Sequence, residues 1–99
     1  MKYKILINPK AKIDIQTAIQ WYNNKSLGLG KIFHLFLKSQ IEVLKSNPFF
    51  QVRYSNVRCL PLRKYPYMIH FTVDESKNEV RIRAVFNTSM DPKKWLKNK

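Results

Sequence analysis

The first half of the chain combines one short β-prone segment with two helical periods. Residues 3–7 (YKILI) predict a strand, and the Asn-Pro pair at 8–9 is typical of the start of a helix. Apolar residues then recur at i, i+3, i+4 and i+7 over residues 15–22. A second helical period opens at residues 27–30 and ends before Pro48, because a residue that precedes proline disfavours the α region. This pattern predicts a helical hairpin with a shared apolar face.

The second half changes to the period of β-strands. Residues 56–64, 67–73 and 79–86 are rich in β-branched and aromatic residues, with apolar and polar positions in near alternation. The polar segment 74–79 (DESKNE) predicts a turn between antiparallel neighbours. These three segments therefore predict strands that follow the hairpin in the chain.

Strict alternation assigns each strand residue to one of two faces. The face predicted to meet the helices carries Ile69, Phe71, Val73, Val80, Ile82, Ala84 and Phe86. The opposite face is predicted to carry Met68, His70, Thr72, Arg81, Arg83 and Val85. One face of the sheet thus suits the helical hairpin, and the other is half basic.

Together these elements predict a single α+β domain over residues 1–99. A two-helix hairpin is expected on one face of a mainly antiparallel four-stranded sheet, in the order β-α-α-β-β-β. No apolar run approaches the roughly 18 residues of a membrane span, and the start of the chain lacks a signal-peptide pattern, so we expect a cytoplasmic protein without membrane contact. The single cysteine, Cys59, excludes an internal disulfide and a multi-cysteine zinc site. No metal-ligand spacing or nucleotide-binding glycine loop is present, so no cofactor is expected.

Charge narrows the classes of partner. Lys and Arg number 19 against six Asp and Glu, which gives a net charge of +13. Such a field accelerates encounters with polyanions such as nucleic acid, the ribosome or acidic protein segments. The sequence therefore predicts weak, non-specific binding of nucleic acid, and the alternative is a highly soluble surface without a polyanionic partner.

Five stretches of the chain, taken in order, resemble one family. They are ILINPKAKIDIQTAIQWYN (5–23), GLGKIF (28–33), NPFFQVRY (47–54), YPYMIHFTV (65–73) and AVFNTSMDPKKW (84–95). With the predicted order of elements, they identify the chain as similar to the RelE/ParE toxin superfamily, and in particular to its ParE-like, plasmid-stabilisation branch.

The resemblance implies the toxin half of a type II toxin–antitoxin module. Such toxins are neutralised by a small antitoxin whose C-terminal segment wraps them, and an acidic antitoxin would suit this basic chain. RelE-like members cut mRNA in the ribosomal A site, whereas ParE-like members poison DNA gyrase. Fold alone does not choose between the two activities.

Three positions of this sequence depart from the ribonuclease pattern. Where ribonuclease members commonly carry an arginine, a histidine and a second arginine, this chain has Met68, Asn87 and Met90. Neither methionine nor asparagine can transfer a proton near neutral pH. The sequence thus favours a binding protein over an enzyme, and the remaining catalytic candidates are His70, Tyr67 and Arg81.

A larger set of residues is predicted to contact a target or an antitoxin. It consists of Arg58, Arg63, Lys64, Tyr67, Arg81, Arg83, Asn87, Lys93 and Lys94. The function expected from these features is a toxin that acts by binding DNA gyrase. A ribosome-dependent mRNA endoribonuclease and a non-toxic binding relative remain as alternatives.

Overall fold

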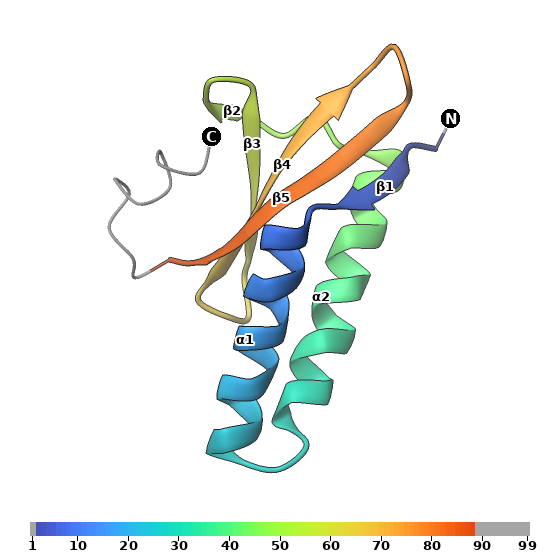
Figure 1. Cartoon of the computed structure of the whole chain (residues 1–99). Helices are drawn as coiled ribbons and strands as arrows, with labels where there is room; N and C mark the ends of the chain where they lie inside the picture. The colour runs from blue at the N-terminus through green and yellow to red at the C-terminus, as the bar shows by residue number, and fades with distance from the viewer. Residues whose placement is uncertain (1, 89–99) are drawn as a thin grey trace.

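The computed structural model describes residues 2–88, which form two helices and five strands (Figure 1). In chain order they are β1 (Lys4–Ile7), α1 (Pro9–Lys25), α2 (Leu29–Ser46), β2 (Val52–Tyr54), β3 (Val57–Leu62), β4 (Tyr67–Asp74) and β5 (Glu79–Asn87). The predicted hairpin and the three predicted C-terminal strands are all present. The predicted order β-α-α-β-β-β is confirmed, with β2 as an additional strand.

The sheet has five strands in the order β1-β5-β4-β3-β2, so the predicted count of four is wrong. The extra strand, β2, is only three residues long and pairs with β3 across the turn Ser55–Asn56. Ser55 has a φ of 48°, a left-handed conformation that closes this tight turn. Three residues are too few to show the period of a strand in the sequence. Such a short strand depends on its pairing with β3 for its stability.

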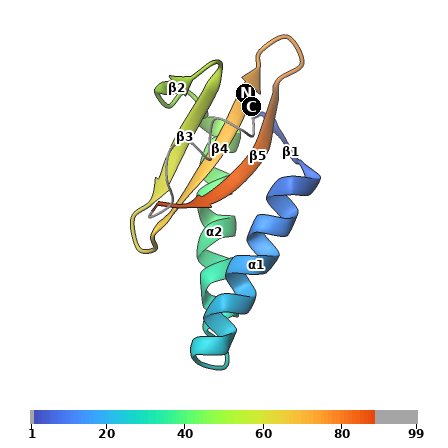
Figure 2. The same ribbon diagram turned by 60° about the vertical axis from the view of Figure 1, so that its left-hand side comes forward.

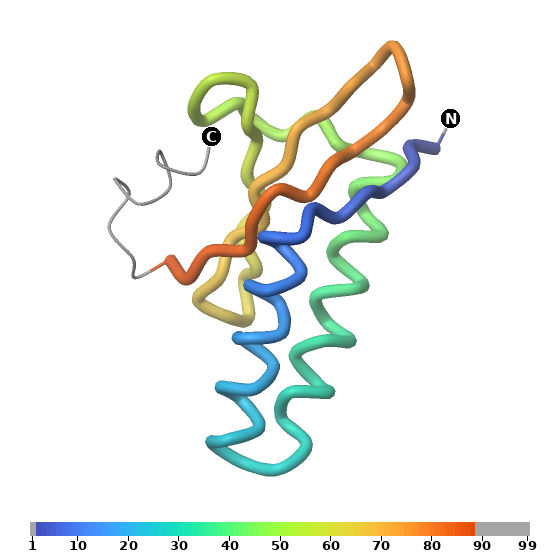
Figure 3. The backbone as a smooth tube through the Cα atoms, viewed as in Figure 1, coloured from blue at the N-terminus to red at the C-terminus, as the bar shows by residue number. Residues whose placement is uncertain are grey.

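Only one pair of neighbours in the sheet is parallel, so the sheet is mainly antiparallel as predicted. β1 pairs with β5 in parallel, and the other neighbours are antiparallel. Figure 3 shows this N-terminal strand beside β5, which lies near the other end of the described chain. The helical hairpin is thus inserted between two strands that become neighbours.

Both helices lie on the same side of the sheet, and their far ends extend beyond it (Figure 2). The core between these layers draws on the inner stripes of the helices and the inner face of the sheet. Its buried members are Ala11, Ile15, Ala18, Phe33, Leu37, Ile41, Leu44, Leu60, Leu62, Tyr67, Ile69, Phe71, Val80, Ile82 and Val85. Burial of this apolar surface is the main favourable term in folding.

The tip of the hairpin depends on a close approach of the two helices. The backbone N–H of Gly30, in the first turn of α2, donates to Oδ1 of Asn23 at 2.8 Å. A Cβ at position 30 would lie 2.5 Å from the carbonyl oxygen of Ile19 and 2.7 Å from the Asn23 side chain. Only glycine leaves enough space for this contact.

The pairing of β4 with β5 contains a β-bulge. His70 pairs with Ala84, but the next residue of β4, Phe71, pairs with Ile82. Arg83 is therefore one extra residue on β5, with no partner of its own on β4. An extra residue shifts the alternation of side chains for the rest of the strand.

Because of the bulge, the last residues of β5 lie on the opposite faces of the sheet from those predicted. Val85 joins the core beneath the helices, together with Val80 and Ile82. Phe86 instead packs on the opposite face, where its ring meets His70 edge to face at 4.8 Å between centroids. The prediction that Ala84 and Phe86 share the helix-facing side was thus wrong, because strict alternation fails at the bulge.

A carboxylate of α1 supports β5 next to the bulge. β1 ends at Ile7, which pairs with Ile82, so the edge of β5 beyond that point has no strand beside it. Asp14 fills this place, and its Oδ2 accepts a hydrogen bond of 2.9 Å from the backbone N–H of Val85. The other carboxylate oxygen forms an ion pair with Lys10.

We expect Asp14→Ala to destabilise the protein by about 1–3 kcal/mol, because a part-buried N–H of β5 loses its acceptor. The matched control is Lys10→Ala, which removes the exposed ion pair and leaves the carboxylate in place. This control should cost no more than about 1 kcal/mol. Urea denaturation measures both values, and equal losses in the two variants would contradict the proposed role of Asp14.

Candidate binding surface

The sheet face opposite the helices, here called the outer face, gathers side chains from β2 to β5. Its central residues, here called the outer cluster, are Tyr54, Cys59, His70, Arg83, Ala84 and Phe86. In the sheet register, His70 lies directly between Cys59 of β3 and Ala84 of β5. The short strand β2 brings Tyr54 to the same histidine.

His70 is the centre of the outer cluster and is 0 % exposed. Its Nδ1 lies 2.9 Å from the hydroxyl of Tyr54, within hydrogen-bond distance. The rings of Tyr54 and Phe86 pack against the imidazole, with centroid distances of 5.7 and 4.8 Å. His70 is therefore enclosed by aromatic side chains, and its ring is not exposed for contact with a phosphate.

Three members of the outer cluster, Tyr54, Cys59 and His70, are uncharged at neutral pH. Burial, with a smaller effect of the Arg53 guanidinium, lowers the pKa of His70 to about 4. Burial raises the pKa of the Cys59 thiol to about 11, although Arg53 opposes the shift. Burial also raises the pKa of the Tyr54 phenol, and Arg83 opposes that rise. None of these three groups can exchange a proton readily near pH 7.

Arginines supply the charge of the outer face. Arg53 is exposed on β2, and Arg83 is half-buried at the bulge, close enough to affect the pKa of Tyr54. Arg81 is exposed, and its Nη1 donates to Oδ1 of Asn8 at 2.9 Å. The outer face thus combines an uncharged centre with arginine side chains, an arrangement suited to holding anionic groups.

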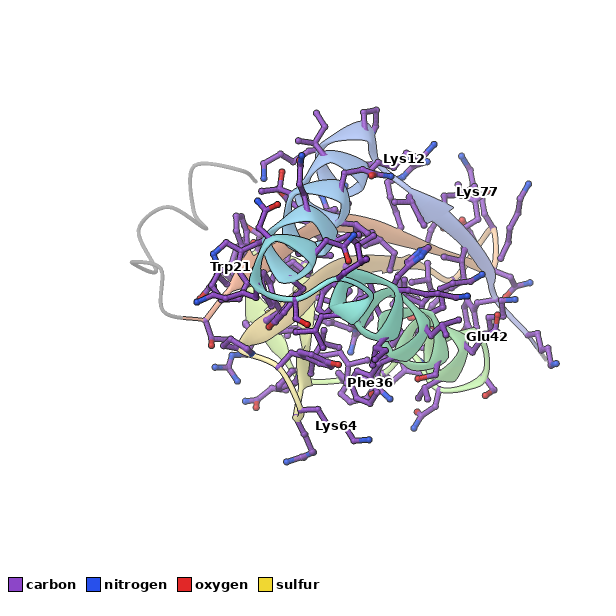
Figure 4. All side chains as sticks on the ribbon, turned by 90° about the horizontal axis from the view of Figure 1, so that it is seen from below. Lys12, Trp21, Phe36, Glu42, Lys64 and Lys77 are labelled. Carbon is purple, nitrogen blue, oxygen red and sulfur yellow. The ribbon has the colours of Figure 1, made fainter. Side chains whose placement is uncertain are left out.

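Arg58, Arg63 and Lys64 lie away from the outer cluster. Arg58 is half-buried, where its Nη1 donates to the backbone oxygen of Phe50 at 2.7 Å. Arg63 and Lys64 are exposed on the turn between β3 and β4. Lys64 lies 5.2 Å from the ring centroid of Phe36 on α2, and Figure 4 shows the two side chains on the side of α2 away from α1.

The remaining predicted residues are also dispersed. Tyr67 is 9 % exposed and belongs to the core, where its ring lies near those of Tyr22 and Phe33. Asn87 is half-buried at the end of β5 and lines a hollow of about 180 Å³ together with Asp14. Three further positions singled out from the sequence, Lys93, Lys94 and Met90, lie outside the described residues. Of the predicted residues within the described range 2–88, the structure places Arg81, Arg83 and His70 on the outer face.

Sequence reasoning missed Arg53, Tyr54 and Phe86. The signal for the first two was the triplet Val-Arg-Tyr followed by a Ser-Asn turn, which is typical of a hairpin. The signal for Phe86 was the uninterrupted apolar run Ala-Val-Phe at 84–86, which a strictly two-sided strand would not require. Both signals are short, and each depends on pairing with a neighbouring strand.

Residues 2–88 contain no group of three or more His, Cys, Asp or Glu placed to hold a metal ion. Within the same part of the chain, neither helix has the length and hydropathy of a membrane span.

Comparison with known proteins relates the fold to that of a solved structure. The sequence matches no protein-family model and no curated protein. Among solved structures, it matches a chain of the "Chromosomal ParDE TA system from P. aeruginosa" with a TM-score of 0.77. That match covers 87 % of this chain and 96 % of the other, at 16 % sequence identity. The chain therefore shares the fold of that chain of the ParDE system. The resemblance predicted from the sequence is thus confirmed at the level of fold.

Within this fold, the Tyr54–His70 hydrogen bond ties the edge strand β2 to the centre of the sheet. We expect Tyr54→Phe to reduce the free energy of unfolding by about 1 kcal/mol, because that bond is lost. Tyr3→Phe is the matched control, since the Tyr3 hydroxyl makes no hydrogen bond within residues 2–88. The control should change stability by only a few tenths of a kcal/mol in urea denaturation. If the two variants were equally stable, the hydrogen bond would not hold β2 in place.

Proposed function

We propose that the protein is the toxin of a type II toxin–antitoxin module, that it works in the cytoplasm, and that it acts by binding DNA gyrase. The toxin role is supported by the fold that the chain shares with a chain of a ParDE toxin–antitoxin system. The choice of binding over cleavage is supported by one observation, the enclosed and uncharged His70 on the outer face. The net charge of +13 supports an acidic partner.

Metal-free RNA cleavage needs a general base, a general acid and cations that stabilise the charge of the transition state. The outer face offers Arg53, Arg81 and Arg83 as cations. It pairs them with a histidine whose pKa is about 4 and which is 0 % exposed. Met68, half-buried on β4, adds no group that can transfer a proton. This chemistry favours a surface that holds a partner.

The neutralising partner in this proposal is a small acidic antitoxin. Its carboxylates would bind the arginines of the outer face, of which Arg81 is already exposed. A charge-assisted hydrogen bond of this kind contributes about 1.5–3 kcal/mol when the complex excludes water from it. Weak binding of nucleic acid follows from the same charge and should decline steeply with salt.

Two assays in parallel test the proposed function. The purified protein should inhibit supercoiling by gyrase, and it should leave a reporter mRNA intact in a translating cell extract. Arg83→Ala should weaken the inhibition about tenfold or more, which corresponds to about 1.4 kcal/mol or more. Lys77→Ala, a control on the exposed turn between β4 and β5, should change it less than twofold.

Other outcomes of these assays would replace the proposal. Codon-positioned cuts that require translating ribosomes, with normal supercoiling, would show a ribosome-dependent endoribonuclease. If the protein neither inhibits supercoiling nor cleaves the reporter mRNA, and its expression does not harm cells, it is a non-toxic relative. Equal inhibition by Arg83→Ala and Lys77→Ala would remove the outer face from the interaction with gyrase.

A further inference from the structure

The end of the helical hairpin that projects beyond the sheet, residues 21–32, carries exposed apolar side chains (Figure 1). We call it the hairpin tip. Leu27, in the link between the helices, is 96 % exposed, and Ile32 and Trp21 are 56 % and 50 % exposed. Leu29, the first residue of α2, is exposed as well. Exposed apolar side chains that gather at one place mark a contact surface, whereas single ones scattered over a protein do not.

The backbone holds Leu27 at the apex of the hairpin tip. Only residues 26–28 link the two helices, and Gly28 has a φ of 95°, which glycine adopts without a steric penalty. The N–H of Leu29 donates to the carbonyl oxygen of Ser26 at 3.1 Å and closes this link. The leucine side chain is therefore presented outward by a defined turn.

The charge of the hairpin tip is positive. Between Asp14 and Glu42 the sequence contains no acidic residue. Lys25 at the end of α1 and Lys31 in the first turn of α2 are both exposed. The Nζ of Lys25 lies 4.7 Å from the ring centroid of Trp21, and Figure 4, which views the hairpin from its tip, shows Trp21 on the side of α1 away from α2. Cations and an aromatic ring thus surround the apolar apex.

We propose that the hairpin tip binds the surface of an anionic lipid bilayer. Leu27 and Leu29 enter the boundary between headgroups and acyl chains, the Trp21 ring lies at headgroup level, and the lysines meet lipid phosphates. Apolar side chains that enter a bilayer by about 5–10 Å, beside lysine and tryptophan, are typical of reversible interfacial binding. Sequence analysis predicted no membrane contact, because no apolar run is long enough to cross a bilayer. A surface contact does not need such a run.

Charge and shape select this occupant over a second copy of the chain. Two tips placed together would bring Lys25 and Lys31 of each copy into proximity, in a protein whose net charge is +13. A net charge far from zero keeps a protein monomeric. An anionic bilayer reverses the sign of the interaction, and its fluid surface accepts a projecting tip without a matching groove. The proposal goes beyond the toxin role and does not depend on it, because the tip is separate from the outer face.

The probes are phosphatidylcholine vesicles with and without phosphatidylglycerol, mixed with the full chain. The substitution Trp95→Phe leaves Trp21 as the one tryptophan. In co-sedimentation, the anionic vesicles should bind about tenfold more tightly or better, because each lysine near an anionic surface contributes about fivefold. The emission of Trp21 should shift to shorter wavelength on binding, and lipids brominated in their acyl chains should quench it.

Two substitutions with the same change in charge separate insertion of the tip from general attraction. Leu27→Glu should weaken binding about tenfold or more, because it removes the apolar apex and adds a negative charge. Ile13→Glu is the matched control, since Ile13 is exposed and lies roughly 18 Å along α1 from its C-terminal end. At that distance from the membrane, charges are screened at physiological salt, so the control should change binding less than about twofold.

Three results would overturn the proposal. The first is no binding to the anionic vesicles. The second is binding with unchanged Trp21 emission, or with equal losses in Leu27→Glu and Ile13→Glu, which would show only a general attraction between a basic chain and anionic lipid. The third is a dimer, formed without vesicles, that Leu27→Glu dissociates, which would assign the hairpin tip to a second copy of the chain.

Discussion

The pairing of β4 with β5 shifts by one residue at Arg83, and the composition of both sheet faces depends on this shift. On the inner face, the shift places Val85 in the core and presents its backbone N–H to Asp14 of α1. On the outer face, it places Phe86 against His70. An unbulged β5 would point Phe86 at the helices and leave the histidine without this aromatic cover.

Enclosure of His70 then determines the chemistry of the outer face. An imidazole in contact with Tyr54 and Phe86 loses the hydration that stabilises its charged form, so its pKa falls to about 4. The arginines at its margin remain charged at every physiological pH. The face is thereby positive and rich in hydrogen-bond donors, and it lacks a group that titrates near neutrality among the members of the outer cluster. Such a face is suited to contact with an anionic or acidic surface.

The sequence predicted the elements whose hydrophobic pattern repeats over many residues. It did not predict the features that depend on one or a few residues. Both helices and the strands β3 to β5 were predicted because their hydrophobic periodicity continues over several helical turns or several alternations of a strand. The strand β2 escaped prediction because three residues such as Val52–Tyr54 carry no measurable period. The facing of Ala84 and Phe86 failed because one inserted residue, Arg83, reverses the alternation, and no glycine marks the bulge.

The same limit explains why the candidate site was predicted only in part. Arg81 and Arg83 were recognised because arginines on an alternating strand stand out against apolar neighbours. Tyr54 and its contact with His70 depend on the pairing of β2 with β3, a tertiary feature that the local pattern does not contain. Tyr67 was predicted at a contact surface, but the structure buries it in the core, where aromatic residues at strand starts often pack.

The proposed function, binding rather than cleavage, depends on a His70 that is enclosed and uncharged at neutral pH. The most direct measurement is an NMR titration of the His70 ring in the folded protein, with exposed His34 as an internal reference. We expect the His70 ring to remain neutral down to about pH 5 and to titrate near pH 4. A His70 ring that titrates between pH 6 and 7, as an ordinary exposed histidine does, would contradict it.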